Sequence, residues 1–168
     1  TIGLVWLVLQ DFGEQWVPWF LSAGALPHLL FYKLAPKYTS KWNPLPTVIG
    51  TDLLRGFLFI GFSFLTPYLT GPDLLWGLIG LSFVSNAFGS LFNTAIFSLP
   101  TQMAKADKLE KLNALLNSCM TAGNVIGPLC AIIMLQSLGL QALMLINGIS
   151  FILSGLLETT IKLDFDSP

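Results

Sequence analysis

Residues 46–69 read PTVIGTDLLRGFLFIGFSFLTPYL, and this run decides the fold because it is long, apolar and interrupted by one acid and one arginine only. A helix needs about 20 mostly apolar residues to cross a bilayer. Pro44 and Pro46 open the run, and Pro67 with the turn Thr70-Gly71-Pro72-Asp73 closes it. The stretch therefore predicts a transmembrane helix followed at once by a tight turn.

Comparable apolar runs lie on both sides of this one. We expect helices at about 16–35, 46–69, 74–100, 112–135 and 141–161, and we interpret residues 1–10 as the outer end of a first helix whose beginning is missing. Hydrophobic residues make up 54% of the chain and charged residues 10%, a balance too apolar for a soluble domain. The runs also lack the alternation of barrel strands. The predicted fold class is an all-α integral membrane bundle over residues 1–168.

The lysines predict the orientation of this bundle. They fall in alternate connections, whereas the turns 11–15, 70–73 and 136–141 contain none; the lysines are Lys33, Lys37, Lys41, Lys105, Lys108, Lys111 and Lys162. Basic residues in alternate short loops mark the cytoplasmic side. We therefore expect a multi-pass protein of the cytoplasmic membrane with loops 33–46 and 101–111 in the cytoplasm.

Several classes of function are disfavoured. The net charge of -1 argues against a nucleic-acid partner, which would require a basic surface. The chain carries no G-x-S-x-G, no P-loop and no metal-binding cluster beyond one histidine. We expect no enzymatic activity, no cofactor and no metal, and we expect membrane lipids as the surroundings.

Asparagines and a histidine are the candidates for lining a cavity. Asn86 and Asn93 are spaced to share a face of the fourth helix, and Asn117 and Asn124 do the same on the fifth. Their amides need partners in hydrocarbon, so each face meets either another helix or a wet cavity. His28, in the middle of the second helix, is either a hydrogen-bonded packing residue or a proton relay.

The remaining charged candidates lie near the cytoplasmic side. Asp52 and Arg55 are one helical turn apart and are spaced to pair, either as a structural ion pair or as a coupling site. Glu158 lies one turn before Lys162, which predicts a pair that snorkels to the interface.

Four segments carry a family resemblance. Gly123-x-x-x-Gly127-Pro128-x-x-Ala131 resembles the antiporter motif G-x-x-x-G-P-x-x-G-G on the fifth helix of major facilitator superfamily exporters. Asp52-Leu53-Leu54-Arg55-Gly56 and Asn147-Gly148-Ile149-Ser150-Phe151 are similar to the third-helix D-L-L-R-A and sixth-helix N-A-L-S-F segments of the macrolide-efflux-like branch, and residues 92–115 resemble its connection between helices four and five. The resemblance implies the amino-terminal six-helix half of a twelve-helix transporter.

That resemblance implies secondary active efflux of amphipathic small molecules by alternating access, with the carboxy-terminal half as a partner and possible coupling to protons. At two positions a charge of the family pattern is lost: Pro36 stands at the aspartate of the signature between helices two and three, and Ile96 replaces an arginine of the fourth helix. These charges hold the cytoplasmic gate in the family. A lipid-transporting or non-transporting scaffold member of the same fold is therefore the alternative.

Overall fold

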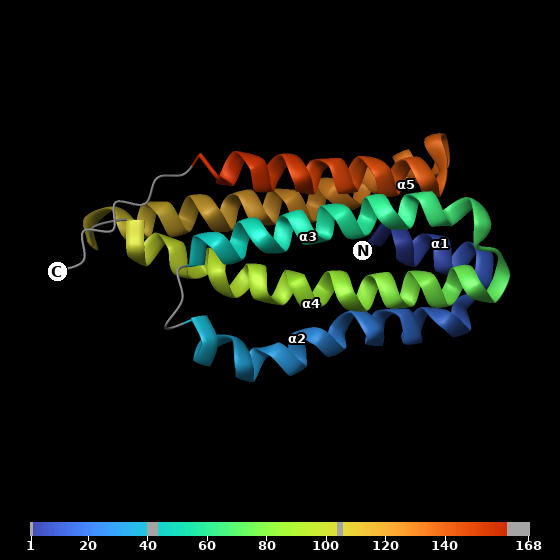
Figure 1. Ribbon diagram of the computed structural model, residues 1–168, viewed down its shortest axis with the longest axis horizontal. Helices are drawn as coiled ribbons and strands as arrows, with labels where there is room; N and C mark the ends of the chain where they lie inside the picture. The colour runs from blue at the N-terminus through green and yellow to red at the C-terminus, as the bar shows by residue number, and fades with distance from the viewer. Residues whose placement is uncertain (1, 40–43, 104–105, 161–168) are drawn as a thin grey trace.

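The computed structural model describes residues 2–39, 44–103 and 106–160, and all of its regular elements are helical (Figure 1). Side chains are described over 3–31, 44–99 and 109–160. In chain order the elements are α1 (Ile2–Phe12), the 3₁₀ turn η1 (Glu14–Trp16), α2 (Val17–Thr39), α3 (Pro44–Leu65), the 3₁₀ turn η2 (Thr66–Tyr68), α4 (Gly71–Met103) and α5 (Ala106–Glu158). The all-α prediction is confirmed.

The element α5 consists of two helical arms joined at Gly139. This glycine has φ 80° and ψ 174°, values outside the helical region, so the chain reverses there. We call residues 106–138 the first arm and residues 140–158 the second arm. Figure 1 shows the second arm returning along the bundle, so the arms occupy the places of the two helices expected at 112–135 and 141–161.

One end of the bundle is closed by tight turns that depend on glycine. The described glycines with positive φ are Gly13, Gly71 and Gly139, and each lies in one of the three turns that carry no lysine. Glycine enters this region without the steric penalty of a Cβ atom. At the same end the indole rings of Trp16 and Trp76 meet edge to face, with centroids 6.0 Å apart.

The other end of the bundle holds the helix ends that flank the lysine-bearing connections. The end of α2, the start of α3, the end of α4 and the start of α5 lie together there (Figure 1). Lys111 is exposed on the first arm. Lys41, Lys105 and Lys162 lie outside the described residues, as do the side chains of Lys33, Lys37 and Lys108. The orientation in the membrane therefore stays a prediction.

Small residues set the closest helix contacts. α3 packs against the second arm of α5 and against α4. α4 also packs against α2. Ser82, Ser85 and Ser90 of α4 are buried in these contacts. Within a lipid bilayer the burial of apolar side chains does not drive helices together, so small residues stabilise the contact by letting the helix backbones approach closely.

The outer surface is apolar. Large hydrophobic side chains such as Trp19, Leu29, Phe57 and Leu157 are exposed. Among the described residues, three helices are long and apolar enough to cross a membrane: Pro44–Tyr68, Gly71–Leu99 and Leu109–Glu158, of which the last contains both arms of α5. α2 is not among these spans, and its side chains are described only as far as Phe31.

Candidate functional site

A polar cluster lies halfway along the contact between α2 and α4. His28 is the central residue of α2, and Asn86 is close to the centre of α4. Gly24, one turn before His28, allows the approach: a Cβ at this position would lie 3.2 Å from Ser82 Oγ and 3.4 Å from Asn86 Nδ2. Pro27 is buried and has no backbone N–H to donate to the carbonyl of Ala23, yet α2 continues through it.

Hydrogen bonds connect the cluster across the two helices. Asn86 Nδ2 donates to Ser82 O at 2.8 Å and lies 3.3 Å from Ser82 Oγ, while Asn86 Oδ1 lies 3.3 Å from His28 Nε2. Ser90 Oγ lies 2.7 Å from His28 Nδ1. The same hydroxyl donates to the backbone oxygen of Asn86 at 3.0 Å. We call His28, Ser82, Asn86 and Ser90 the His28 cluster.

The His28 cluster reaches the surface of the described bundle. His28 itself is exposed, whereas Ser82 and Ser90 are buried between the helices. An imidazole at mid-height is costly against lipid tails. We therefore expect this face of α2 and α4 to meet a water-filled cavity or another protein surface. Asn93 is half-buried two turns further along α4.

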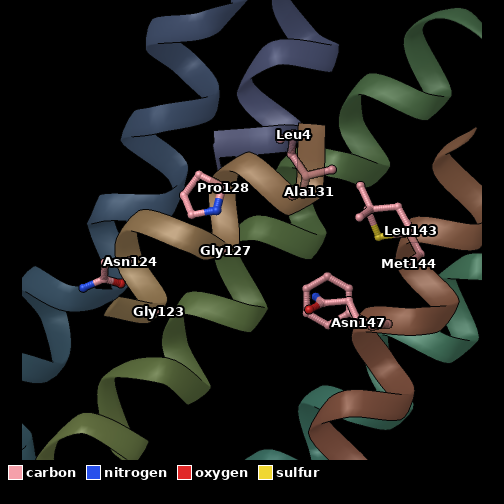
Figure 2. A pocket seen from close by; sticks show the side chains of 11 residues that line it. Leu4, Gly123, Asn124, Gly127, Pro128, Ala131, Leu143, Met144 and Asn147 are labelled. Atoms are coloured by element: carbon pink, nitrogen blue, oxygen red, sulfur yellow. The ribbon is translucent and has the colours of Figure 1, made fainter. Parts of the chain in front are cut away.

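A pocket of about 480 Å³ lies between α1, α3 and the two arms of α5. Its walls are mostly apolar, and two amides, Asn124 and Asn147, stand among them. Figure 2 shows Gly127, Pro128 and Ala131 of the first arm opposite Leu143, Met144 and Asn147 of the second. Binding pockets for small molecules are commonly concave, largely apolar and furnished with a few polar groups.

The first arm of α5 carries the predicted asparagines on the same face as Ala131, which contacts α1. Asn117, Asn124 and Ala131 follow at spacings of seven, so they share a face, and a Cβ on Gly3 of α1 would lie 3.0 Å from Ala131 Cβ. Both asparagines are exposed. A Cβ on Gly123 or Gly127 would meet no atom within 4 Å, so these two glycines make no close helix contact within the described bundle.

A buried charged cluster joins α3 to the second arm of α5. Arg55 Nη1 lies 3.6 Å from Asp52 Oδ1, and the guanidinium carbon of Arg55 lies 4.1 Å from the ring centroid of Phe151. Ser154 donates to Glu158 Oε1 at 3.3 Å and also lies beside the Asp52 carboxyl group. Within the described chain, Asp52 Oδ1, Arg55 Nε and Glu158 Oε2 are buried without a hydrogen-bond partner.

This arrangement extends the predicted pairings. The predicted pair of Glu158 with Lys162 stays a prediction, because Lys162 lies outside the described residues. The structure places Glu158 beside Asp52 and Ser154. Ser154 and Phe151 were not singled out from the sequence. Their spacing to Glu158, four and seven residues, puts all three on one face and was the available signal.

The two departures from the family pattern lie in different settings. Ile96 packs against Val48, Ala95 and Leu99, so an apolar contact between α3 and α4 occupies the place of the expected arginine. The side chain of Pro36 lies outside the described set. Asn147, which lines the pocket, was quoted only as part of a motif and not as a cavity residue.

Comparison with known proteins gives a family match over nearly the whole chain. The sequence model of the Major Facilitator Superfamily matches residues 1–163. Two relatives, from Bacillus amyloliquefaciens and Bacillus subtilis, both named "Putative bacilysin exporter BacE", are 24% identical over 152 residues, which is 90% of this chain and 37% of each relative. A BacE from Bacillus subtilis strain 168 is 25% identical over 122 residues, or 28% of its length. No solved structure gives a significant match.

Proposed function

Because this chain belongs to the Major Facilitator Superfamily, we propose that it is the amino-terminal bundle of a secondary active transporter that exports amphipathic small molecules. Two relatives bear the name "Putative bacilysin exporter BacE", and the chain spans 37% of the length of each. The observation that carries the proposal is the pocket of about 480 Å³, in which Asn124 and Asn147 offer amides within apolar walls. An amphipathic solute would bury its apolar part there and bond its polar part to the amides.

Alternating access requires a second bundle that moves against this one. The first arm of α5 offers a surface for it, because apolar side chains such as Val125, Ile126 and Leu129 are exposed there. The missing carboxy-terminal half would close on this face and on the His28 cluster. Loops 33–46 and 101–111 would then face the cytoplasm.

The test is export by the complete protein in lipid vesicles. A fluorescent hydrophobic dye is loaded, proton or sodium gradients are imposed, and dye loss is compared with that from protein-free vesicles. We expect faster loss with protein under at least one gradient. Equal rates under every gradient would remove the exporter proposal.

The apolar packing of Ile96 supports an alternative function, because the gate charge expected at this position is absent. The alternative is a member of the same fold that transports lipid or serves as a non-transporting scaffold. The same vesicles distinguish these cases when they carry a fluorescent phospholipid in the inner leaflet. Movement of the phospholipid without dye export indicates lipid transport, and movement of neither probe indicates a scaffold.

A further inference from the structure

The hydrogen bonds of the His28 cluster determine where protons lie. Ser82 O is a carbonyl oxygen and can only accept, so the amide nitrogen of Asn86 faces it at 2.8 Å. Asn86 Oδ1 therefore points to His28 Nε2, and an amide oxygen also only accepts. The Nε2 atom of His28 must carry a hydrogen in either charge state of the ring.

The second ring nitrogen has a partner that serves both charge states. In the neutral ring, Nδ1 accepts a hydrogen bond from the hydroxyl of Ser90 at 2.7 Å. In the charged ring, Nδ1 donates to the same oxygen, and the Ser90 hydroxyl turns to donate to Asn86 O at 3.0 Å. A turn of one hydroxyl thus keeps both ring nitrogens hydrogen-bonded with or without the extra proton, and only the bond from Ser90 to Asn86 O is exchanged.

We propose that His28, Asn86 and Ser90 form a reversible proton-binding site in the middle of the bundle, and that this proton is coupled to export. The coupling rests on the proposed function; the binding of the proton does not. His28 is exposed, so protons can reach it from the cavity side, while Ser90 is buried and holds the inner nitrogen in place. Imidazole is the side chain suited to exchange protons between about pH 5 and 8.

The charged groups around this site are few in the described chain. Between 74 and 99 α4 carries no charged residue, and Asp73, Asp11 and Glu14 lie at the far end of the bundle. Arg55 of α3 approaches α4 at Gly89, where a Cβ would lie 3.8 Å from Nη2, and it is engaged with Asp52 and Phe151. The side chains of Lys33 and Lys37 lie outside the described set.

The direct test follows the ring of His28 in the complete protein labelled with ¹⁵N-histidine. Its signals are assigned as those absent from the His28→Gln variant, and they are followed from pH 4 to 9. We expect a titrating ring in the native protein. Ser90→Ala should move the midpoint away from the native value, because the ring then loses the hydroxyl that bonds Nδ1 in both charge states.

The matched control is Ser82→Ala, which removes a hydroxyl from the same face of α4 but from the amide side of Asn86 rather than from the ring. Its midpoint should stay at the native value. A ring that does not titrate in this range, or equal midpoints in Ser82→Ala and Ser90→Ala, would overturn the proton site.

Coupling is tested separately by export rates against pH. His28→Gln should abolish the pH dependence of export, and an unchanged pH profile would overturn the coupling. A native protein that exports no dye contradicts the proposed function alone, because the ring titration remains readable.

Discussion

Gly56 of α3 and Gly148 of α5 cross with their backbones in contact: a Cβ on Gly56 would lie 3.0 Å from Gly148 O, and a Cβ on Gly148 would lie 2.9 Å from Gly56 O. The side chains of Ile152 and Ile60 cover the crossing, at 2.5 Å and 2.6 Å from these two Cβ positions. The two motifs that resemble the family on helices three and six therefore meet at this point, and the glycines are required by sterics.

Enlarging Gly148 should destabilise the bundle. Gly148→Val would force the two backbones apart and should lower the free energy of unfolding by about 1–3 kcal/mol. Thermal unfolding of the complete protein in detergent measures this. Gly61→Val is the control, since a Cβ at Gly61 of α3 meets no atom within 4 Å. Equal losses in both variants would contradict the close crossing.

Arg55 should be essential to the stability of the charged cluster. Asp52 is 2% exposed, so Arg55→Gln leaves a buried carboxylate without its ion pair and should cost roughly 3–5 kcal/mol. The double variant Asp52→Asn with Arg55→Gln should recover part of this loss, which a double-mutant cycle on unfolding free energies would measure. Strictly additive losses would contradict the pairing.

Replacing Glu158 should change the stability of the protein differently from replacing one member of a surface ion pair. It lies beside Asp52, a like charge, and one of its buried oxygens has no hydrogen-bond partner, so Glu158→Gln should stabilise the protein by about 1 kcal/mol. Lys162→Gln is the comparison, because the sequence predicts Lys162 as the partner of Glu158. Equal destabilisation by the two substitutions would instead indicate the Glu158–Lys162 pair that the sequence predicts.

Filling the pocket should block export while the fold is kept. Gly127→Leu places a side chain in open space on the pocket wall, and we expect the dye export rate to fall at least tenfold, the equivalent of about 1.4 kcal/mol. Gly80→Leu on α4, also in open space but away from the pocket, should retain export. Equal rates for Gly127→Leu and the native protein would show that the solute does not use this pocket.

Labelling from one side of the membrane checks the orientation. In a background where the exposed Cys119 and Cys130 are serine, we expect Lys111→Cys to react with an impermeant maleimide only from the cytoplasm, and Gln136→Cys only from outside. The first arm of α5 separates these two exposed positions along its length. Reaction of both from the same side would contradict the predicted topology.

The sequence by itself determined the helical class and the places where the chain turns. The apolar runs exceed the length of a membrane crossing, and glycine at 13, 71 and 139 marks the three turns, because local sterics decide which residues accept positive φ. It also placed Asp52 and Arg55 one turn apart, since that spacing belongs to a single helix.

Only the tertiary structure decided which helices share a polar contact. His28 meets Asn86 and Ser90 on α4, and Glu158 meets Asp52 rather than a described lysine, because the rotation and axial offset of each helix are set by packing at sites such as Gly24, Gly56 and Gly148. The spacing of residues along one helix does not determine its rotation or offset relative to another helix. The hydrogen-bond partners between helices therefore became known only from the packed structure.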